Sequence, residues 1–175
     1  MSSSTPDTSA PNATPAAVLT VSDSCSRGEK VDLSGPAVAE ALARRNFQVL
    51  VRSVVADERT AIQEKLIELC RSARLVVTTG GTGIAPRDVT PEATRAVTDR
   101  EIPGFGEVMR ARGRESTPLA ALSRSLAATR GNVLIVNLPG SPKAAVESLD
   151  AIVELVPHVL ELLAGRTGHT AAAQD

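Results

Sequence analysis

Four short runs rich in β-branched and other apolar residues recur along the chain and predict strands. They occupy residues 17–21, 49–55, 75–77 and 133–137. The first run shows no polar alternation, which is typical of a strand covered on both faces. The pattern therefore predicts a sheet that lies buried between other elements.

Segments with apolar residues at helical spacing separate these strands. They begin at Ser34, Glu58, Thr90 and Pro142. In the last segment the apolar residues share one face as far as Leu163, and we expect Pro157 to kink or restart the helix. The pattern weakens after residue 100. There we expect a break at 102–104, a polar helix over 107–114 and a short edge strand over 122–127.

The alternation of strand and helix predicts an α/β fold, a three-layer sandwich with a mostly parallel sheet and helices on both faces. With 175 residues, 42% of them hydrophobic, the chain is long enough for one sizeable core. We expect residues 16–165 to form a single domain. Residues 1–15 are rich in Ser, Thr, Pro and Ala and predict a disordered tail, and residues 166–175 predict a flexible one.

The composition excludes several classes of function. A net charge of -1 gives no general attraction to nucleic acid or to an anionic membrane. There is no Trp or Tyr, and Phe47 and Phe105 are the only Phe residues, so no aromatic platform for stacking bases can be built. Any heterocycle must be held by backbone, aliphatic and polar contacts.

Residues 1–15 lack the positive start and apolar core of a signal peptide, and no later segment is an uncharged apolar run long enough to span a bilayer, so we expect a cytoplasmic protein. Cys25 and Cys70 are expected to be free thiols in a reducing compartment. They form no ligand cluster with His158 and His169, which argues against a structural zinc site.

A glycine-rich loop follows the third predicted strand and is the strongest candidate for an active site. Residues 79–83 read Thr-Gly-Gly-Thr-Gly, and Arg87 and Asp88 precede a helix start at Thr90. The loop is not a Walker A motif, because no lysine follows its glycines, and Pro86 stands where the dinucleotide motif needs its third glycine. Loops at the carboxyl ends of strands are where open α/β sheets bind ligands, and glycines let backbone N–H groups approach an anion.

Three loops, after Thr20, Val77 and Val136, are expected on the same edge of the sheet. Together they supply glycine amides, hydroxyl groups and two acidic residues, Asp57 and Asp88. The amides suit a phosphate-rich substrate, and carboxylates that hold Mg²⁺ suit nucleotide chemistry.

Five collinear motifs resemble those of the molybdopterin adenylyltransferases (the MogA type) of molybdenum cofactor synthesis. They lie at residues 20–28, 32–36, 79–94, 102–107 and 130–142, and the resemblance covers about residues 17 to 164. It implies that the protein transfers AMP from ATP to the terminal phosphate of molybdopterin, with Mg²⁺, and releases pyrophosphate. It further implies a homotrimer, or a hexamer, and a possible hand-over of product to a molybdate-insertion enzyme.

The resemblance also implies roles for particular residues. Asp88 and Asp57 match the family's acidic residues and are expected to act in catalysis as magnesium ligands. The expected substrate and nucleotide contacts are Ser22, Asp23, Ser24, Thr79, Gly80, Gly81, Thr82, Gly83, Arg87, Pro139, Gly140 and Ser141.

Structural alternatives stand beside these roles. Asp57 and Ser141 each precede a helix and can serve as N-caps, and Asp88 can brace its own loop. Arg87 either clamps a phosphate or pairs with Glu92 in the first helical turn. At the level of function, the alternative to an enzyme is a non-catalytic molybdopterin-binding carrier or scaffold of the same fold. The molybdate-inserting enzymes that share the fold are much longer and lack the run Arg-Asp-Val-Thr-Pro found at residues 87–91.

Overall fold

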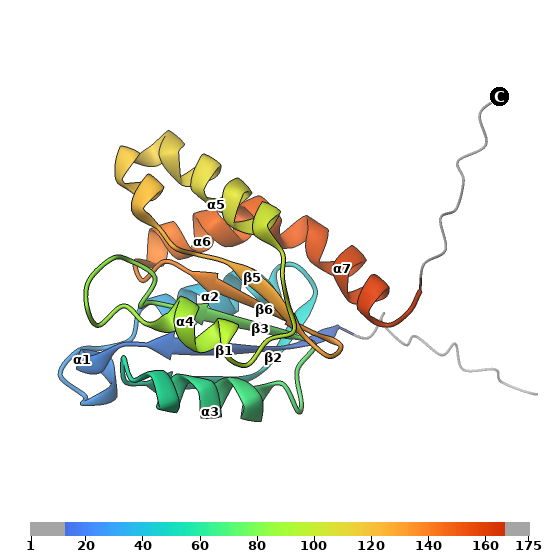
Figure 1. Cartoon of the computed structure of the whole chain (residues 1–175), viewed down its shortest axis with the longest axis horizontal. Helices are drawn as coiled ribbons and strands as arrows, with labels where there is room; N and C mark the ends of the chain where they lie inside the picture. The colour runs from blue at the N-terminus through green and yellow to red at the C-terminus, as the bar shows by residue number, and fades with distance from the viewer. Residues whose placement is uncertain (1–12, 167–175) are drawn as a thin grey trace, which may run out of the picture.

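A computed structural model describes residues 13–166 of the chain (Figure 1). The expected terminal tails lie almost wholly outside this range. Within it, no helix is long and apolar enough to cross a bilayer.

A mixed sheet of six strands forms the centre of the molecule. Its strands are β1 (Thr14–Val21), β2 (Phe47–Val55), β3 (Leu75–Thr79), β4 (Arg100–Glu101), β5 (Ala127–Arg130) and β6 (Val133–Leu138). Their order is β2-β1-β3-β6-β5-β4. The first four in this order are parallel, and β5 pairs antiparallel with both of its neighbours. The predicted mostly parallel sheet is therefore confirmed.

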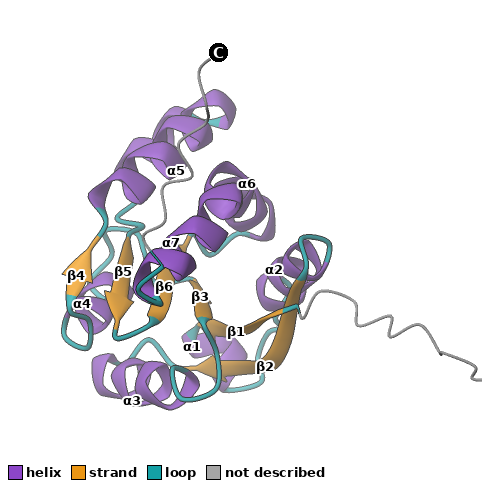
Figure 2. Cartoon of the chain, turned by 90° about the vertical axis from the view of Figure 1, so that its right-hand side faces the viewer, coloured by secondary structure: helices purple, strands orange, loops and turns teal. Residues whose placement is uncertain are grey.

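Helices cover both faces of the sheet (Figure 2). They are α1 (Asp23–Ser26), α2 (Ser34–Ala43), α3 (Arg59–Leu69), α4 (Thr90–Arg95), α5 (Pro103–Ser116), α6 (Pro142–Ile152) and α7 (Val156–Leu163), with 3₁₀ helices η1 (Pro118–Leu122) and η2 (Val153–Leu155). One core cluster joins the sheet to α2, α5, α6 and α7. The other joins it to α3 and α4. Successive residues of β1, β3 and β6 point alternately into the two clusters, so these strands are mostly apolar, and their buried polar residues are Thr20, Thr78, Thr79 and Asn137.

The region between residues 100 and 130 differs from the prediction. The expected strand over 122–127 is wrong: Leu122 ends η1, and the strand begins only at Ala127. The polar helix begins at Pro103, earlier than expected, because proline fits the first turn of a helix and needs no hydrogen-bond acceptor there. Residues 100–101 form a short edge strand that the polar sequence did not indicate.

Two further boundaries are informative. β1 begins at Thr14 rather than at residue 17, because the N–H of Thr14 bonds the carbonyl of Asn46, 3.1 Å away, and pairing with β2 extends the strand. The predicted restart at Pro157 is confirmed. α6 ends at Ile152, η2 intervenes, and Pro157 lies in the first turn of α7.

The neighbouring parallel strands β1, β3 and β6 bring their following loops to one edge of the sheet, as predicted. β2 lies beside β1, so the loop that carries Asp57 reaches the same edge. The candidate active site is built from these four loops.

Candidate active site

Asp23 and Asp57 hold each other across the loops that follow β1 and β2. The N–H of Asp23 donates to Asp57 Oδ2 at 2.8 Å, and the N–H of Asp57 donates to Asp23 Oδ1 at 3.0 Å. Asp57 does not cap α3, whose N-cap is Glu58. The N-cap alternative for Asp57 is therefore wrong, and its carboxylate is fixed by a partner 34 residues away in the sequence.

Arg87 crosses the site and joins three loops. Its guanidinium donates to both carboxylate oxygens of Asp23, at 3.0 and 2.8 Å, and to Glu58 Oε1 at 3.0 Å. These hydrogen bonds hold the pKa of Asp23 below its usual range, against the opposing effect of burial. The expected alternative pairing of Arg87 with Glu92 is wrong, because Glu92 pairs with Arg124 instead.

The two carboxylates expected to be catalytic, Asp57 and Asp88, have neighbouring positions in the site. Burial raises the pKa of Asp57, the N–H of Asp23 opposes that rise, and the negative charges of Asp23 and Asp88 add to it. Asp88 Oδ2 accepts the N–H of Ala85 at 2.9 Å, so this carboxylate also braces its loop. Asp88 therefore braces its loop, as the structural alternative proposed, and also lines the cavity where a magnesium ligand was expected.

The glycine loop passes very close to these groups. Gly80 and Gly81 have φ values of 103° and 65°, in the region that favours glycine. A Cβ on Gly81 would lie 2.4 Å from Thr90 Oγ1 and 3.1 Å from Asp57 Oδ1. Within residues 13–166, no hydrogen bond leaves the N–H groups of Gly81, Thr82 and Gly83. Amides of this kind can bind an anion.

Several of the residues expected to contact substrate have structural partners. Thr79 is fully buried, and its hydroxyl donates to the carbonyl of Pro139 at 2.7 Å. Ser22 caps α1 and accepts the N–H of Cys25. Ser141 caps α6 and accepts the N–H of Ala144 at 3.2 Å, which confirms the capping alternative. Ser24 lies beside Ser22, with 3.2 Å between their hydroxyl oxygens.

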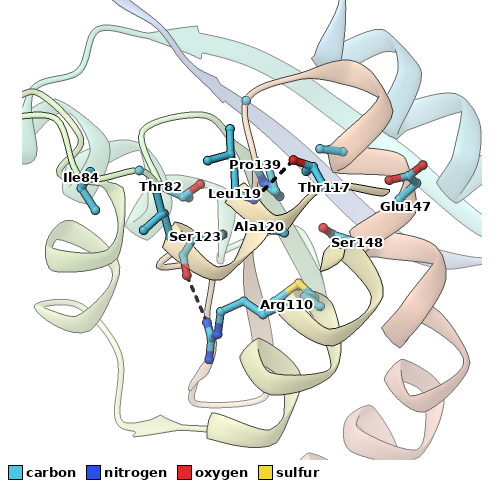
Figure 3. A pocket seen from close by; sticks show the side chains of 16 residues that line it. Thr82, Ile84, Arg110, Thr117, Leu119, Ala120, Ser123, Pro139, Glu147 and Ser148 are labelled. Atoms are coloured by element: carbon cyan, nitrogen blue, oxygen red, sulfur yellow. Dashed lines mark hydrogen bonds between the residues drawn. The ribbon is translucent and has the colours of Figure 1, made fainter. Parts of the chain in front are cut away.

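Two cavities adjoin the glycine loop. The first, which we call the acidic cavity, has a volume of ≈ 380 Å³. It is lined by Asp32, Asp57 and Asp88 together with Ser22, Thr79, Gly80, Gly81 and Gly140. The second, which we call the apolar cavity, has a volume of ≈ 390 Å³ and lies between the glycine loop, α5, η1 and α6 (Figure 3). Its walls include Thr82, Gly83, Ile84, Met109, Arg110, Leu119, Leu122, Pro139, Gly140 and Glu147. Gly140 lines both cavities.

Two further residues belong to this site, and neither was among the expected substrate or nucleotide contacts. Asp32 lines the acidic cavity, and its carboxylate accepts the hydroxyl of Thr20 at 2.7 Å and the N–H of Gly35 at 2.9 Å. Arg124 contacts the glycine loop from the far side, with its Nε 2.7 Å from the carbonyl oxygen of Gly83. Asp32 begins one of the five sequence motifs, residues 32–36, and could have been selected from it, whereas none of the motifs contains Arg124.

The acidic cavity offers a donor set that fits Mg²⁺. Asp57 and Asp88 each have one carboxylate oxygen engaged by a backbone N–H group, and within residues 13–166 their Oδ1 atoms accept no hydrogen bond. In the same part of the chain, no group of three or more His, Cys, Asp or Glu side chains is placed to hold a metal ion. Two carboxylates suit Mg²⁺, which is commonly bound by one or two of them together with substrate phosphates.

Residues 17–158 match a family described as the probable molybdopterin binding domain. The chain belongs to this family. It is 45% identical to the molybdopterin adenylyltransferase of Helicobacter pylori J99 over 152 residues, 85% of this chain and 86% of that protein. It is 40% identical to the Escherichia coli K12 molybdopterin adenylyltransferase over 171 residues, 88% of this chain and 87% of that protein.

Solved structures of the family agree. The molybdopterin biosynthesis enzyme MoaB of Thermus thermophilus has a TM-score of 0.81 and 48% identity, over 87% of this chain and 97% of that one. The molybdopterin biosynthesis Mog protein of Mycobacterium ulcerans has a TM-score of 0.80 and 38% identity, over 86% of this chain and 99% of that one. The resemblance identified from the five sequence motifs is confirmed, and the matched range of the family includes all four loops of the site.

Proposed function

We propose that the protein is a molybdopterin adenylyltransferase, which transfers AMP from ATP to the terminal phosphate of molybdopterin and releases pyrophosphate. The observation that carries the proposal is the pair of cavities on the glycine loop, one of them lined by Asp57 and Asp88. Two substrates must meet in this reaction, and the cavities share Gly140. The high identity to adenylyltransferases over most of the chain supports the same reaction.

The linings support an assignment of one substrate to each cavity. The acidic cavity suits the nucleotide, because its carboxylates can share a cation with the phosphates. The apolar cavity suits the pterin, with aliphatic walls and the polar groups of Arg110, Glu147 and Ser148 at its sides (Figure 3). Among residues 13–166, no aromatic side chain lines this cavity, so aliphatic and polar contacts would hold the heterocycle there.

The reaction needs no covalent protein nucleophile. An oxygen of the molybdopterin phosphate, already ionised at neutral pH, attacks the α-phosphorus of ATP. The bond from that phosphorus to the bridging oxygen breaks, and pyrophosphate leaves with the bonding electrons. The residues of the site have to bring two polyanions together and hold them in line, which is the main source of rate in phosphoryl chemistry.

Each group of the site has a task in this scheme. The N–H groups of Gly81, Thr82 and Gly83 bind phosphate oxygens. The loop that carries them lines both cavities, so it lies where the two substrates meet. Arg87, which is paired with Asp23 and Glu58, holds the surrounding loops together at the edge of the site. Asp57 and Asp88 would hold Mg²⁺, which supplies neutralisation of the phosphate charge when bound.

Other expectations from the resemblance stay predictions. They are a homotrimer, with a hexamer as the alternative, delivery of product to a molybdate-insertion enzyme, and a cytoplasmic location. Light scattering on the purified protein measures the first of these directly.

A turnover assay tests the proposed function. Purified protein is incubated with molybdopterin, ATP and Mg²⁺, and both pyrophosphate and adenylated pterin are followed. We expect Asp88→Asn to lose at least ~10²-fold in rate, on the scale of removing one electrostatic stabiliser. Asp150→Asn is the matched control, because Asp150 pairs with Arg45 on the surface and should leave the rate unchanged.

The alternative function has its own signature in this assay. A carrier or scaffold would bind molybdopterin without releasing pyrophosphate, in the wild type as well as in the variant. Full activity of Asp88→Asn would instead contradict the role of that carboxylate while leaving the reaction intact.

A further inference from the structure

Arg124 lies in the segment between η1 and β5, and its backbone N–H and two of its guanidinium nitrogens donate to the loop that carries Asp88. Its backbone N–H donates to the carbonyl of Thr82 at 2.8 Å, and Nε donates to the carbonyl of Gly83 at 2.7 Å. Nη2 donates to the carbonyl of Asp88, and Nη1 pairs with Glu92 at the start of α4. One residue thus contacts both ends of the loop from Gly83 to Asp88.

We propose that Arg124 is a positioning residue, which fixes the Gly83–Asp88 loop and thereby places the Asp88 carboxylate in the active site. The proposal rests on the proposed function only for the effect on turnover. The contacts between Arg124 and the loop are a property of the fold.

The chemistry of the guanidinium explains why an arginine stands here. Its donors form a planar, rigid fork, so they can reach the two separate carbonyls and the Glu92 carboxylate at the same time. Lysine has one charged centre and cannot span both ends of the loop. At the tip of that loop, the residues between the two carbonyls are exposed, so they contribute little packing of their own to hold its shape.

The loop's internal contacts depend on this closure. The N–H of Asp88 donates to the carbonyl of Ala85 at 2.9 Å, and the N–H of Ala85 donates back to Asp88 Oδ2 at 2.9 Å. The second bond includes the carboxylate expected to act in catalysis. Fixing the main chain at residues 83 and 88 therefore fixes the direction of the Asp88 side chain.

The segment that carries Arg124 is itself held from α5. Arg110 Nη1 donates to the carbonyl of Ser125 at 3.0 Å and to that of Ser123 at 3.3 Å, on either side of Arg124 (Figure 3 shows the contact with Ser123). Arg110 also lines the apolar cavity. A chain of contacts thus leads from α5 through Arg124 to Asp88.

Hydrogen exchange tests the brace without any use of activity. Exchange rates of the amides of Ala85 and Asp88 are measured in the wild type, in Arg124→Lys and in Arg112→Lys. Arg112 is the matched control, since it pairs with Glu115 on the exposed side of α5. We expect about tenfold faster exchange at Ala85 and Asp88 in Arg124→Lys, on the scale of losing a charge-assisted hydrogen bond, and wild-type rates in the control.

Two further variants separate the contacts and guard against misfolding. Glu92→Gln removes the ion pair and keeps the two carbonyl contacts, so the loop should exchange as in the wild type. If melting shows that Arg124→Lys is unfolded at the assay temperature, Arg124→Gln takes its place. Wild-type exchange at Ala85 and Asp88 in the folded Arg124 variant would overturn the proposal.

Turnover then shows whether the brace acts through Asp88. We expect Arg124→Lys to lower kcat about 10²-fold with KM for ATP changed less than about threefold, because a small misplacement of a catalytic group costs this much. The double variant Arg124→Lys/Asp88→Asn should be no slower than Asp88→Asn alone. Losses that multiply would refute action through Asp88. If the wild type releases no pyrophosphate, the proposed function fails, and the exchange rates alone decide the role of Arg124.

Discussion

Replacing Gly81 by alanine introduces one methyl group at the point where the glycine loop, α4 and Asp57 meet. That methyl group would lie 2.4 Å from Thr90 Oγ1 and 3.1 Å from Asp57 Oδ1. The Thr90 hydroxyl is buried and donates to the carbonyl of Gly80 at 2.9 Å. The substitution therefore disturbs a buried hydrogen bond and an expected catalytic carboxylate together.

The expected loss of stability follows from two contributions. A left-handed backbone at φ 65° costs an alanine about 1 kcal/mol or slightly more. Displacing the Thr90 hydroxyl leaves a buried carbonyl without its donor, which costs about 2 kcal/mol. The sum, about 3 kcal/mol, corresponds to a fall in Tm of about 6–12 °C for a chain of this size.

Gly131→Ala is the matched control for this measurement. Gly131 also has a positive φ, 53°, but a Cβ there meets nothing within 4 Å. Its substitution carries the backbone cost alone, about 1 kcal/mol, and should leave turnover unchanged. Both variants are compared with the wild type by urea unfolding at equal protein concentration and by pyrophosphate release, where Gly81→Ala should lose about 10²-fold. Equal stability and equal turnover in the two variants would refute the close approach of Gly81 to Thr90 and Asp57.

Two further substitutions test a half-buried carboxylate of the site and a buried amide of the core. Asp57→Asn should abolish most turnover yet raise Tm at pH 7. The pKa of Asp57 is raised in the folded protein, so its ionised form destabilises the fold at a pH above the unfolded-state pKa of 3.8, and the gain from asparagine should vanish as the pH falls below 3.8. A Tm below that of the wild type at pH 7 would contradict this sign. Asn137→Ala should cost about 2–4 kcal/mol in urea unfolding, because its buried amide donates to the hydroxyls of Thr78 and Thr94, each at 3.0 Å. Asn132→Ala, at an exposed position, is the control, and equal midpoints for the two would refute the estimate.

Local pattern was enough to predict the centre of the fold. The apolar runs at 17–21, 75–77 and 133–137 became β1, β3 and β6, because strands covered on both faces need apolar residues at most positions. The prediction failed around residues 122–127, where Leu122 is apolar but half exposed at the end of a 3₁₀ helix. Leu122 lines the apolar cavity, and from the sequence alone an apolar residue in a cavity wall cannot be told from one in a strand.

The site was predicted in part, for a similar reason. Strand order brings Asp57, Asp88 and the glycine loop together, and the predicted parallel sheet indicated this. The partners of those residues come from far along the chain: Arg87 contacts Asp23 across 64 residues, and Arg124 contacts Gly83 across 41. No periodicity links such positions, so the sequence left Arg87 with two alternatives and did not single out Arg124.

The contact between Gly80 and Gly140 restricts how this protein can be altered in length. A Cβ on Gly140 would lie 3.3 Å from the Cα of Gly80, so two main chains touch directly at the edge of the sheet. An inserted residue in either connection would separate them and open the wall between the cavities. The turn at Gly131, on the opposite edge of the sheet, has no such neighbour, because a Cβ there meets nothing within 4 Å. A tag, a fused domain or a new chain terminus therefore belongs at Gly131, where it leaves both cavities intact.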